Sequence, residues 1–382
     1  MRVVNVVGAR PNFMKIAPLL REMRKHPEIS PLLVHTGQHY DAHMAGQFFQ
    51  DLLLPPPDVS LEVGSGSHAY QTGEVMKRIE PVLEEMRPNL VVVVGDVNST
   101  LAVALTAAKL RIPVAHVEAG LRSFDRTMPE EINRLVTDAV SDYLFVTEES
   151  GRQNLLREGI NESKIFFVGN VMIDSLEESR RLWERSNIHD CLELKKGTYG
   201  VVTLHRPSNV DDPTMLGGII GALARVACEL PLIFPVHPRT RKHLEAMNGA
   251  APTFWGDDGK VLPRGISCLD PLNYVDFMAL VAHARLVLTD SGGLQEETTV
   301  LGIPCLTLRE NTERPVTVTH GTNRVIGMSP ARITEEAFGI LASPQPASSS
   351  PPLWDGRAAE RIVTILKAHL LALRIPSTAR NS

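Results

Sequence analysis

Short apolar segments alternate along this chain with longer segments of helical periodicity, and this alternation restricts the possible folds more than any other feature. The apolar segments of the first half are rich in valine and show no polar alternation, as expected for strands buried on both faces of a parallel sheet. They occupy residues 3–8, 31–35, 89–95, 112–118, 142–147 and 164–169, with helices expected near 12–25, 67–86, 98–110, 130–140 and 149–157. This order predicts β-α-β units around a parallel sheet.

The alternation pauses through a polar helical segment near residues 172–196 and then begins again, with strands expected at 199–205, 230–237, 284–290 and 303–308. A chain of 382 residues, 43% of them hydrophobic, is long enough to bury two cores. We therefore expect an α/β protein of two Rossmann-like domains, residues 1–170 and 171–356, whose parallel sheets face a central cleft. An amphipathic helix at 357–374 is expected to return to the first domain and complete it.

Charge and cysteine content disfavour several classes of partner. With 39 basic and 44 acidic residues the formal charge is −5, which provides no basic field for a nucleic acid or an anionic membrane. No apolar stretch approaches the roughly 18 residues of a membrane span, and the first residues show no signal-peptide pattern, so a cytoplasmic protein is expected. Reduced thiols are favoured over disulfides or a zinc site because no CxxC spacing occurs among Cys191, Cys228, Cys268 and Cys305.

Polar and charged residues follow most of the predicted strands. In open parallel sheets, ligands bind beyond the carboxyl ends of the strands. The residues at these positions are Arg10, Lys15, the segment 37–39, Asp96, Glu118, His205, Arg206, His237 and the segment 290–293. Any one of them could be a simple cap or turn residue, but a charged set at equivalent positions of two sheets predicts that together they line one cleft.

The first strand-to-helix turn, residues 8–13, does not have the pattern of a nicotinamide-binding domain. It lacks GxGxxG, and the second predicted strand ends in His35 and Thr36 without an acidic residue for the ribose. No nicotinamide cofactor is therefore expected. Arg10 instead provides a forked cation suited to a diphosphate, and its position at a helix start would be electrostatically unfavourable without an anion.

Residues 287–297 predict a strand, a turn of small residues and the start of a helix. Ser291, Gly292 and Gly293 would allow a phosphate to approach the backbone N–H groups at the positive end of that helix. Ser291 could equally serve only as an N-cap, with the glycines forming the turn. Glu297, about one turn further on, could reach ribose hydroxyls rather than the phosphates that it would repel.

Carboxylates at strand ends are candidates for acid and base chemistry. Asp96 and Glu118 follow neighbouring strands, and carboxylates in a cleft suit proton transfer. Glu130 and Glu131 stand at an expected helix start, where the helix dipole alone also favours acidic residues. No metal site is expected, because no further ligand pattern accompanies the three histidines spaced by four residues, His35, His39 and His43.

Eight motifs, in their order along the chain, resemble those of the non-hydrolysing UDP-N-acetylglucosamine 2-epimerases. They are GARPNFMK (8–15), GD (95–96), HVEAGLR (116–122), PEEINR (129–134), GN (169–170), HR (205–206), DSGGLQEE (290–297) and TERP (312–315). The resemblance extends from residue 1 to about 328 and implies a GT-B architecture and a homodimer. It also implies reversible epimerisation at carbon 2 of UDP-N-acetylglucosamine, by anti elimination of UDP to a 2-acetamidoglucal and re-addition.

The same resemblance implies roles for individual residues. Asp96, Glu118 and Glu130 match the family's catalytic carboxylates, and His205 matches its cleft histidine near the phosphates. The residues that match the UDP-binding set, with Lys15 beside it, are Arg10, Lys15, Ser291, Gly292, Gly293, Glu297 and Arg314. The chain departs from the family pattern at residues 38–40 and 205–208, so the resemblance does not extend to the second, activating UDP-N-acetylglucosamine that those segments help to bind.

Other functions share part of this pattern. A GT-B glycosyltransferase would have the same UDP site but would add the sugar to an acceptor. A sugar-nucleotide sensor would be expected to lack one of the three carboxylates, Asp96, Glu118 or Glu130. A hydrolysing relative and an epimerase of a modified UDP-sugar, such as a diacetamido uronic acid, stay open on the motifs alone.

Overall fold

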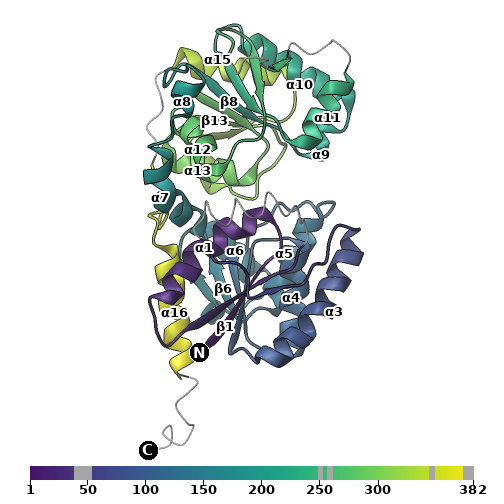
Figure 1. The fold of residues 1–382 in the computed structure, drawn as a ribbon, viewed down its shortest axis with the longest axis vertical. Coiled ribbons are helices and arrows are strands. Elements are labelled where there is room, and N and C mark those ends of the chain that lie inside the picture. The colour runs from purple at the N-terminus through teal and green to yellow at the C-terminus, as the bar shows by residue number, and fades with distance from the viewer. Residues whose placement is uncertain (38–53, 248–252, 256–260, 344–348, 373–382) are drawn as a thin grey trace, which may run out of the picture. The chain divides into compact units, whose positions relative to one another are not determined.

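The computed structural model of this chain describes residues 1–37, 54–247, 253–255, 261–343 and 349–372 (Figure 1). The chain forms two compact units, one of residues Met1–Glu178 with Pro352–Ser382 and one of residues Ser179–Pro351. Each unit is an α/β layer structure with its own seven-stranded sheet. The expected class, two Rossmann-like α/β units with parallel sheets, is therefore confirmed.

The first unit is built on a sheet whose strands pair in parallel in the order β3-β2-β1-β4-β5-β6-β7. These strands are β1 (Arg2–Val7), β2 (Ser30–His35), β3 (Val59–Ser60), β4 (Leu90–Val94), β5 (Val114–Ala119), β6 (Tyr143–Val146) and β7 (Ile165–Phe167). Every residue of β4 is buried, which is the reason for its unbroken valine composition. The strand order reverses between β1 and β4, and ligands bind at such switch points.

Helices cover both faces of this sheet. They are α1 (Arg10–Arg24), α3 (His68–Met86), α4 (Asn98–Lys109), α5 (Pro129–Val140), α6 (Glu149–Arg157), the short η1 (Glu162–Lys164), α7 (Val171–Trp183) and α16 (Ala358–Ala372). The apolar faces of α3 and α4 pack with β1 and β4 in one core. In Figure 1, α16 lies beside α1, and Lys367 Nζ contacts His26 Nδ1 at 2.9 Å and Glu28 Oε1 at 2.7 Å.

The second unit repeats this plan. Its strands pair in parallel in the order β10-β11-β9-β8-β12-β13-β14. They are β8 (Gly200–Thr203), β9 (Leu232–Pro235), β10 (Thr253–Trp255), β11 (Ile266–Leu269), β12 (Leu286–Thr289), β13 (Cys305–Thr307) and β14 (Asn323–Val325). The switch point of this sheet lies between β8 and β12.

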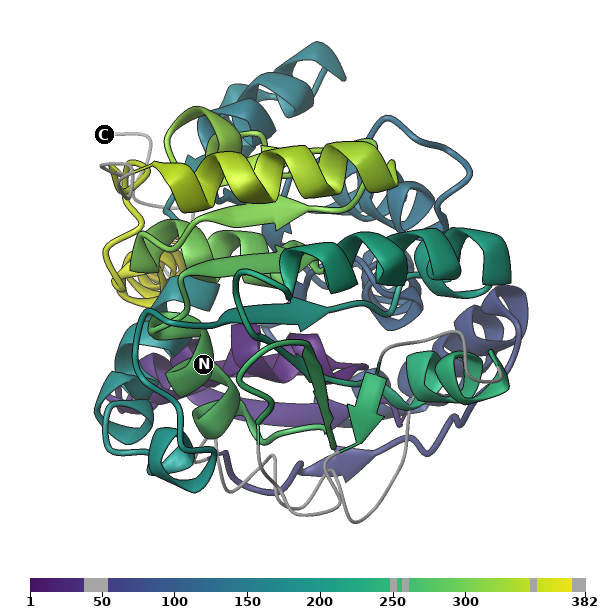
Figure 2. The same ribbon diagram turned by 90° about the horizontal axis from the view of Figure 1, so that it is seen from above.

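The helices of the second unit are α8 (Ile188–Cys191), α9 (Pro207–Val210), α10 (Pro213–Val226), α11 (Pro238–Ala246), α12 (Tyr274–Ala282), α13 (Gly292–Leu301), α14 (Val316–Thr319) and α15 (Pro330–Ala342). Figure 2 shows α10 and α15 side by side along the sheet, and Arg225 Nη2 donates to Thr334 Oγ1 at 3.2 Å between them. Both helices pack their apolar faces on one core with β8, β9 and β12.

Some elements differ from the sequence-based expectation. The polar segment expected to be helical through 172–196 divides into α7 and the short α8. Strands β3, β10, β11 and β14 were not predicted. Polar residues interrupt three of them, namely Ser60 in β3, Ser267 in β11 and Arg324 in β14, so no apolar run marks these strands. The first unit continues through Glu178, past the expected boundary at 170, because the start of α7 packs within it: Ser175 Oγ donates to Met14 O, and Glu178 pairs with Arg21.

Candidate functional site

The turn between β1 and α1 is fixed by Asn12 to the end of the neighbouring strand β4. Asn12 Oδ1 accepts from Ala9 N at 3.0 Å, and Asn12 Nδ2 donates to Val94 O at 3.0 Å. About one helical turn further on, the buried Lys15 forms an ion pair with Glu118, which β5 carries. A Cβ on Gly95 would lie 3.0 Å from Lys15 Nζ, so the glycine that follows β4 makes room for this pair. The structure therefore brings together two residues that the sequence proposed separately.

The carboxylate of Asp96, which follows β4, is held by an arginine on α5. Arg134 donates from Nε at 3.0 Å and from Nη2 at 2.8 Å to Asp96 Oδ2. Arg134 itself is buried and also donates from Nη1 to Glu131 Oε2 at 2.5 Å. Sequence reasoning did not identify Arg134 as a site residue, although its place one turn after Glu130 in the PEEINR segment was a usable signal.

The two glutamates at the start of α5 have different environments. Glu131 is buried, and its carboxylate accepts from Ser123 N at 2.9 Å and from Phe124 N at 3.0 Å. It therefore fixes the loop that follows β5. Glu130 is half-buried and makes no hydrogen bond or ion pair within the described part of the chain. Of the pair, Glu130 is the residue available to a ligand.

Several predicted positions cannot be placed. The side chain of Arg10 lies outside the described part of the chain, although its backbone begins α1. Residues 38–40, one of the two segments that depart from the family pattern, also lie outside it, as does His43. Among the residues that the structure describes, no group of three or more His, Cys, Asp or Glu side chains is placed to hold a metal ion. Within the same ranges, no helix is both long and apolar enough to cross a membrane.

In the second unit, the fully buried Asp290 orients the predicted histidine. Asp290 Oδ2 accepts from the backbone N–H groups of His205 at 2.9 Å and Arg206 at 2.8 Å, and Oδ1 lies 2.8 Å from His205 Nδ1. Burial alone would raise the pKa of Asp290, but the hydrogen bonds and charge of His205 hold it below its usual value. Because Nδ1 donates to Asp290, Nε2 of the half-exposed ring is the nitrogen left for a ligand.

The first turn of α13 combines a helix N-terminus with a cation. Ser291 is the N-cap, and Leu294 N donates to its Oγ at a long 3.5 Å. A Cβ on Gly292 would lie only 2.7 Å from Arg314 Nη1, so the guanidinium rests against the backbone of this turn. A cation at the positive end of a helix is unfavourable by itself, whereas an anion there would be bound by both. The arrangement therefore suits an anion.

Buried carboxylates anchor Arg314 in this position. Its Nε donates to Glu296 Oε1 at 2.5 Å, and its Nη1 lies 3.3 Å from Glu313 Oε2. Glu313 in turn accepts from Arg309 Nη2 at 2.6 Å and Nη1 at 3.0 Å. Sequence reasoning proposed Arg314 but not the three residues that anchor it, because their roles depend on contacts between α13 and the loop that joins β13 to α14.

Glu297 lies on α13 beside Tyr274, whose hydroxyl donates to Glu297 Oε1 at 3.0 Å. Burial raises the pKa of Glu297 to about 8; the hydrogen bond from Tyr274 opposes this shift, and the charge of Glu296 adds to it. At neutral pH, Glu297 therefore holds a proton in the folded protein and can donate a hydrogen bond as well as accept one.

The raised pKa of Glu297 predicts a pH-dependent effect of Glu297→Gln on stability. Above its usual pKa of about 4.3, the unfolded chain has lost this proton, whereas the folded protein keeps it up to about pH 8. The contribution of Glu297 to stability therefore falls as pH rises across this range and then levels off. In thermal unfolding, the melting temperature of Glu297→Gln minus that of the wild type should increase from about pH 5 to pH 8. Glu335→Gln, at an exposed position on α15, is the control. If the melting temperatures of Glu297→Gln and the wild type differ by the same amount at every pH, the raised pKa of Glu297 is contradicted.

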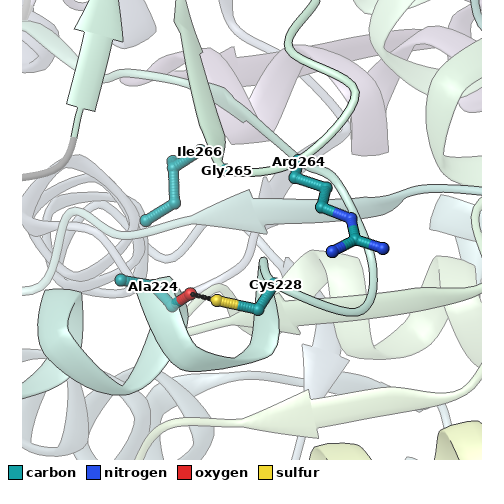
Figure 3. A pocket seen from close by; sticks show the side chains of 5 residues that line it. All are labelled: Ala224, Cys228, Arg264, Gly265 and Ile266. Atoms are coloured by element: carbon teal, nitrogen blue, oxygen red, sulfur yellow. Dashed lines mark hydrogen bonds between the residues drawn. The ribbon is translucent and has the colours of Figure 1, made fainter.

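One pocket lies apart from these residues. Figure 3 shows it lined by Ala224, Cys228, Arg264, Gly265 and Ile266, with Cys228 Sγ 3.4 Å from Ala224 O. Ile266 is the first residue of β11, so the pocket lies at the amino end of that strand. None of the candidate residues, which follow the carboxyl ends of strands, belongs to it.

The candidate residues thus gather near the carboxyl ends of strands in two Rossmann-like units, where open parallel sheets bind their ligands. A sequence profile described as UDP-N-acetylglucosamine 2-epimerase matches residues 21–367. The chain belongs to this family, whose members are isomerases.

Three relatives illustrate the similarity. A UDP-N-acetylglucosamine 2-epimerase homolog of Methanococcus maripaludis is 44% identical over 369 residues, covering 96% of this chain and 99% of the relative. The UDP-2,3-diacetamido-2,3-dideoxy-D-glucuronate 2-epimerase of Pseudomonas aeruginosa is 40% identical over 340 residues, covering 88% and 91%. The crystal structure of Methanocaldococcus jannaschii UDP-GlcNAc 2-epimerase in complex with UDP-GlcNAc and UDP is 40% identical, with a TM-score of 0.85 over 96% of this chain and 100% of that one.

Proposed function

We propose that this protein interconverts UDP-N-acetylglucosamine and UDP-N-acetylmannosamine by inverting carbon 2 of the sugar. The observation that carries the proposal is the arrangement at the switch point of the first unit. There Asp96 follows β4 and Glu118 lies near the end of the neighbouring β5. Each is hydrogen-bonded to a cation from a helix, Arg134 or Lys15. Such fixed carboxylates suit proton transfer at a sugar ring.

The chemistry explains why an anion site must accompany them. The hydrogen on carbon 2 is not adjacent to a carbonyl, so a carboxylate cannot remove it without a change at carbon 1. In the proposed route the bond between carbon 1 and the UDP oxygen breaks, its electron pair leaves with UDP, and the proton on carbon 2 passes to a carboxylate. The product is a 2-acetamidoglucal. Protonation of carbon 2 on the opposite face and return of the UDP oxygen to carbon 1 complete the inversion.

We assign proton transfer and stabilisation of the ring to Asp96, Glu118 and Glu130. The diphosphate is assigned to the first turn of α13, where backbone N–H groups and the Arg314 guanidinium would stabilise the charge of departing UDP. His205, through Nε2, and Arg10 and Lys15 are proposed to assist there, and Glu297 to bind the ribose.

A second substrate has support from one relative. The Pseudomonas aeruginosa protein, 40% identical, is named for a diacetamido glucuronate. The same carboxylates and anion site would serve such a sugar, which differs at carbons 3 and 6 rather than at the reacting carbons. We favour UDP-N-acetylglucosamine because the relative with 40% identity and a TM-score of 0.85 was crystallised with that compound.

The proposal is tested by incubating the purified protein with UDP-N-acetylglucosamine in D2O, without nicotinamide and with a chelator of divalent metals. Proton NMR should show UDP-N-acetylmannosamine forming, with deuterium at carbon 2 of the product. The diacetamido uronate is offered in a parallel reaction. If the protein converts only the diacetamido uronate, that sugar is its substrate and UDP-N-acetylglucosamine is not. A requirement for added NAD would contradict the elimination route.

The assignment of the diphosphate predicts a specific binding defect. Gly292→Ala would place a methyl group 2.7 Å from Arg314 Nη1 and push the guanidinium from the first turn of α13. A lost charge-assisted contact is worth about 1.5–3 kcal/mol, so UDP affinity should fall about tenfold or more in calorimetry. Gly339→Ala on α15, with no atom within 4 Å of the new methyl group, is the matched control. Unchanged UDP affinity in Gly292→Ala would remove this turn from the diphosphate site.

A further inference from the structure

The backbone of Glu118 has a conformation that side chains with a Cβ rarely adopt. Its φ is 75°, in the left-handed region. The pairing of β5 with β6 shifts register between Val117 and Ala119, so Glu118 is the extra residue of a β-bulge. A bulge redirects a side chain, and such strain persists only where the surroundings hold it. Something must therefore hold the chain on both sides of Glu118.

A single carboxylate, that of Asp138 on α5, contacts both sides of the bulge. Asp138 Oδ1 lies 2.6 Å from Nδ1 of His116, two residues before Glu118. Asp138 Oδ2 accepts from the backbone N–H of Gly120, two residues after it, at 3.1 Å, and from Arg122 Nη2 at 2.7 Å. All three contacts are made to the segment 116–122, which carries Glu118.

His116 extends this network to the second carboxylate. Its Nε2 lies 2.8 Å from the carbonyl oxygen of Gly95, the residue before Asp96. Both ring nitrogens of the fully buried imidazole thus lie within hydrogen-bond distance of protein oxygen atoms. Burial would raise the pKa of Asp138, but the charges and hydrogen bonds of His116 and Arg122 hold it below its usual value.

We propose that Asp138 and His116 are positioning residues that fix the Glu118 bulge and the turn before Asp96, and so set the two carboxylates for the reaction. The proposal rests on the roles assigned above to Asp96 and Glu118. Neither positioning residue can touch the substrate, because Asp138 is 1% exposed and His116 is 0% exposed. Replacing a buried pair of ionisable residues with apolar residues often leaves a fold equally stable or more stable, so stability alone gives no reason for the presence of Asp138 and His116.

The decisive variant is Asp138→Asn. The amide keeps the volume but replaces one of the two acceptor oxygens with a donor, so it cannot accept from His116, Gly120 and Arg122 together. The kcat per folded molecule should fall by about 10- to 10²-fold, as expected for a misplaced catalytic group, while KM and the Kd for UDP stay within about twofold. The ratio of released 2-acetamidoglucal to epimerised product should rise, which a loss of folded protein would not cause. His116→Gln should show the same pattern if Asp138→Asn does not fold.

Asp174→Asn is the matched control. Asp174 is equally buried in the same unit, but it accepts from Ala358 N at 3.1 Å and Ala359 N at 2.7 Å at the start of α16. It should lose stability and keep its kcat. The proposal is overturned if Asp138→Asn and His116→Gln keep a normal kcat while Glu118→Gln is impaired, or if Asp174→Asn loses as much kcat per folded molecule. Normal turnover by Glu118→Gln would overturn the assigned role of Glu118 and this proposal with it.

Discussion

Glu130→Gln is expected to lower turnover by about 10²- to 10⁴-fold, the range typical of a lost general acid or base. The amide keeps the size of the side chain and removes only its titratable charge. Because Glu130 makes no hydrogen bond or ion pair within the described part of the chain, the substitution leaves no partner without its contact. The Kd for UDP should therefore match that of the wild type, and the melting temperature should fall only by what the lost charge at the helix start contributes, about 0.3–1 kcal/mol of stability. Steady-state kinetics, thermal unfolding and calorimetry measure the three quantities.

Glu149→Gln is the matched control for Glu130→Gln. Glu149 is also a glutamate in the first turn of a helix of the same unit, but it is exposed at the start of α6. It should retain wild-type turnover. A Glu130→Gln variant that epimerises at a normal rate would show that Glu130 does no more than favour the start of α5 through the helix dipole.

The buried ion pair between Lys15 and Glu118 should give the largest effect on stability. Lys15→Met removes the cation and leaves the carboxylate of Glu118 in a buried position, which typically costs about 3–5 kcal/mol. Combining it with Glu118→Gln removes the buried charge as well. The double variant should therefore regain part of the lost free energy of unfolding, but none of the turnover, because the proposed catalytic carboxylate is absent. Denaturant unfolding and steady-state kinetics of all four proteins form the cycle.

A surface pair at the C-terminal end of α1 provides the comparison. Lys25 and Glu22 contact each other at 2.6 Å, but the lysine is largely exposed, so Lys25→Met should cost about 0–1 kcal/mol. Additive effects of Lys15→Met and Glu118→Gln on stability would show that the pair is not coupled in solution. Recovery of turnover in the double variant would exclude Glu118 from catalysis.

The sequence predicted the plan of the fold and the chemical type of the site more fully than it predicted the geometry of the site. Valine runs such as 89–95 identified the buried parallel strands, because such strands need an apolar face on both sides. The carboxyl ends of these runs gave Asp96 and Glu118, since strand ends meet at one edge of a sheet. Strands β11 and β14 were missed because the polar residues Ser267 and Arg324 interrupt their apolar residues.

The supporting residues could not be predicted because their roles depend on contacts distant in sequence. Arg134 reaches Asp96 across 38 positions, and Asp138 reaches His116 across 22. Periodicity indicates that α5 is a helix, but it does not indicate which of its charged residues meets which strand end. Glu130 and Glu131 show the same limit, since adjacent residues of one type take the roles of available carboxylate and buried loop anchor.

The central claim is that the bond between carbon 1 and UDP breaks during inversion of carbon 2, and positional isotope exchange tests this most directly. UDP-N-acetylglucosamine carrying ¹⁸O only in the oxygen that bridges carbon 1 and the β-phosphorus is incubated with the protein and followed by ³¹P NMR. If UDP departs and returns, rotation of the freed phosphate group will move the label into the non-bridging β-phosphoryl positions as epimerisation proceeds. Full conversion to the epimeric mixture with the label still in the bridge would contradict the elimination mechanism.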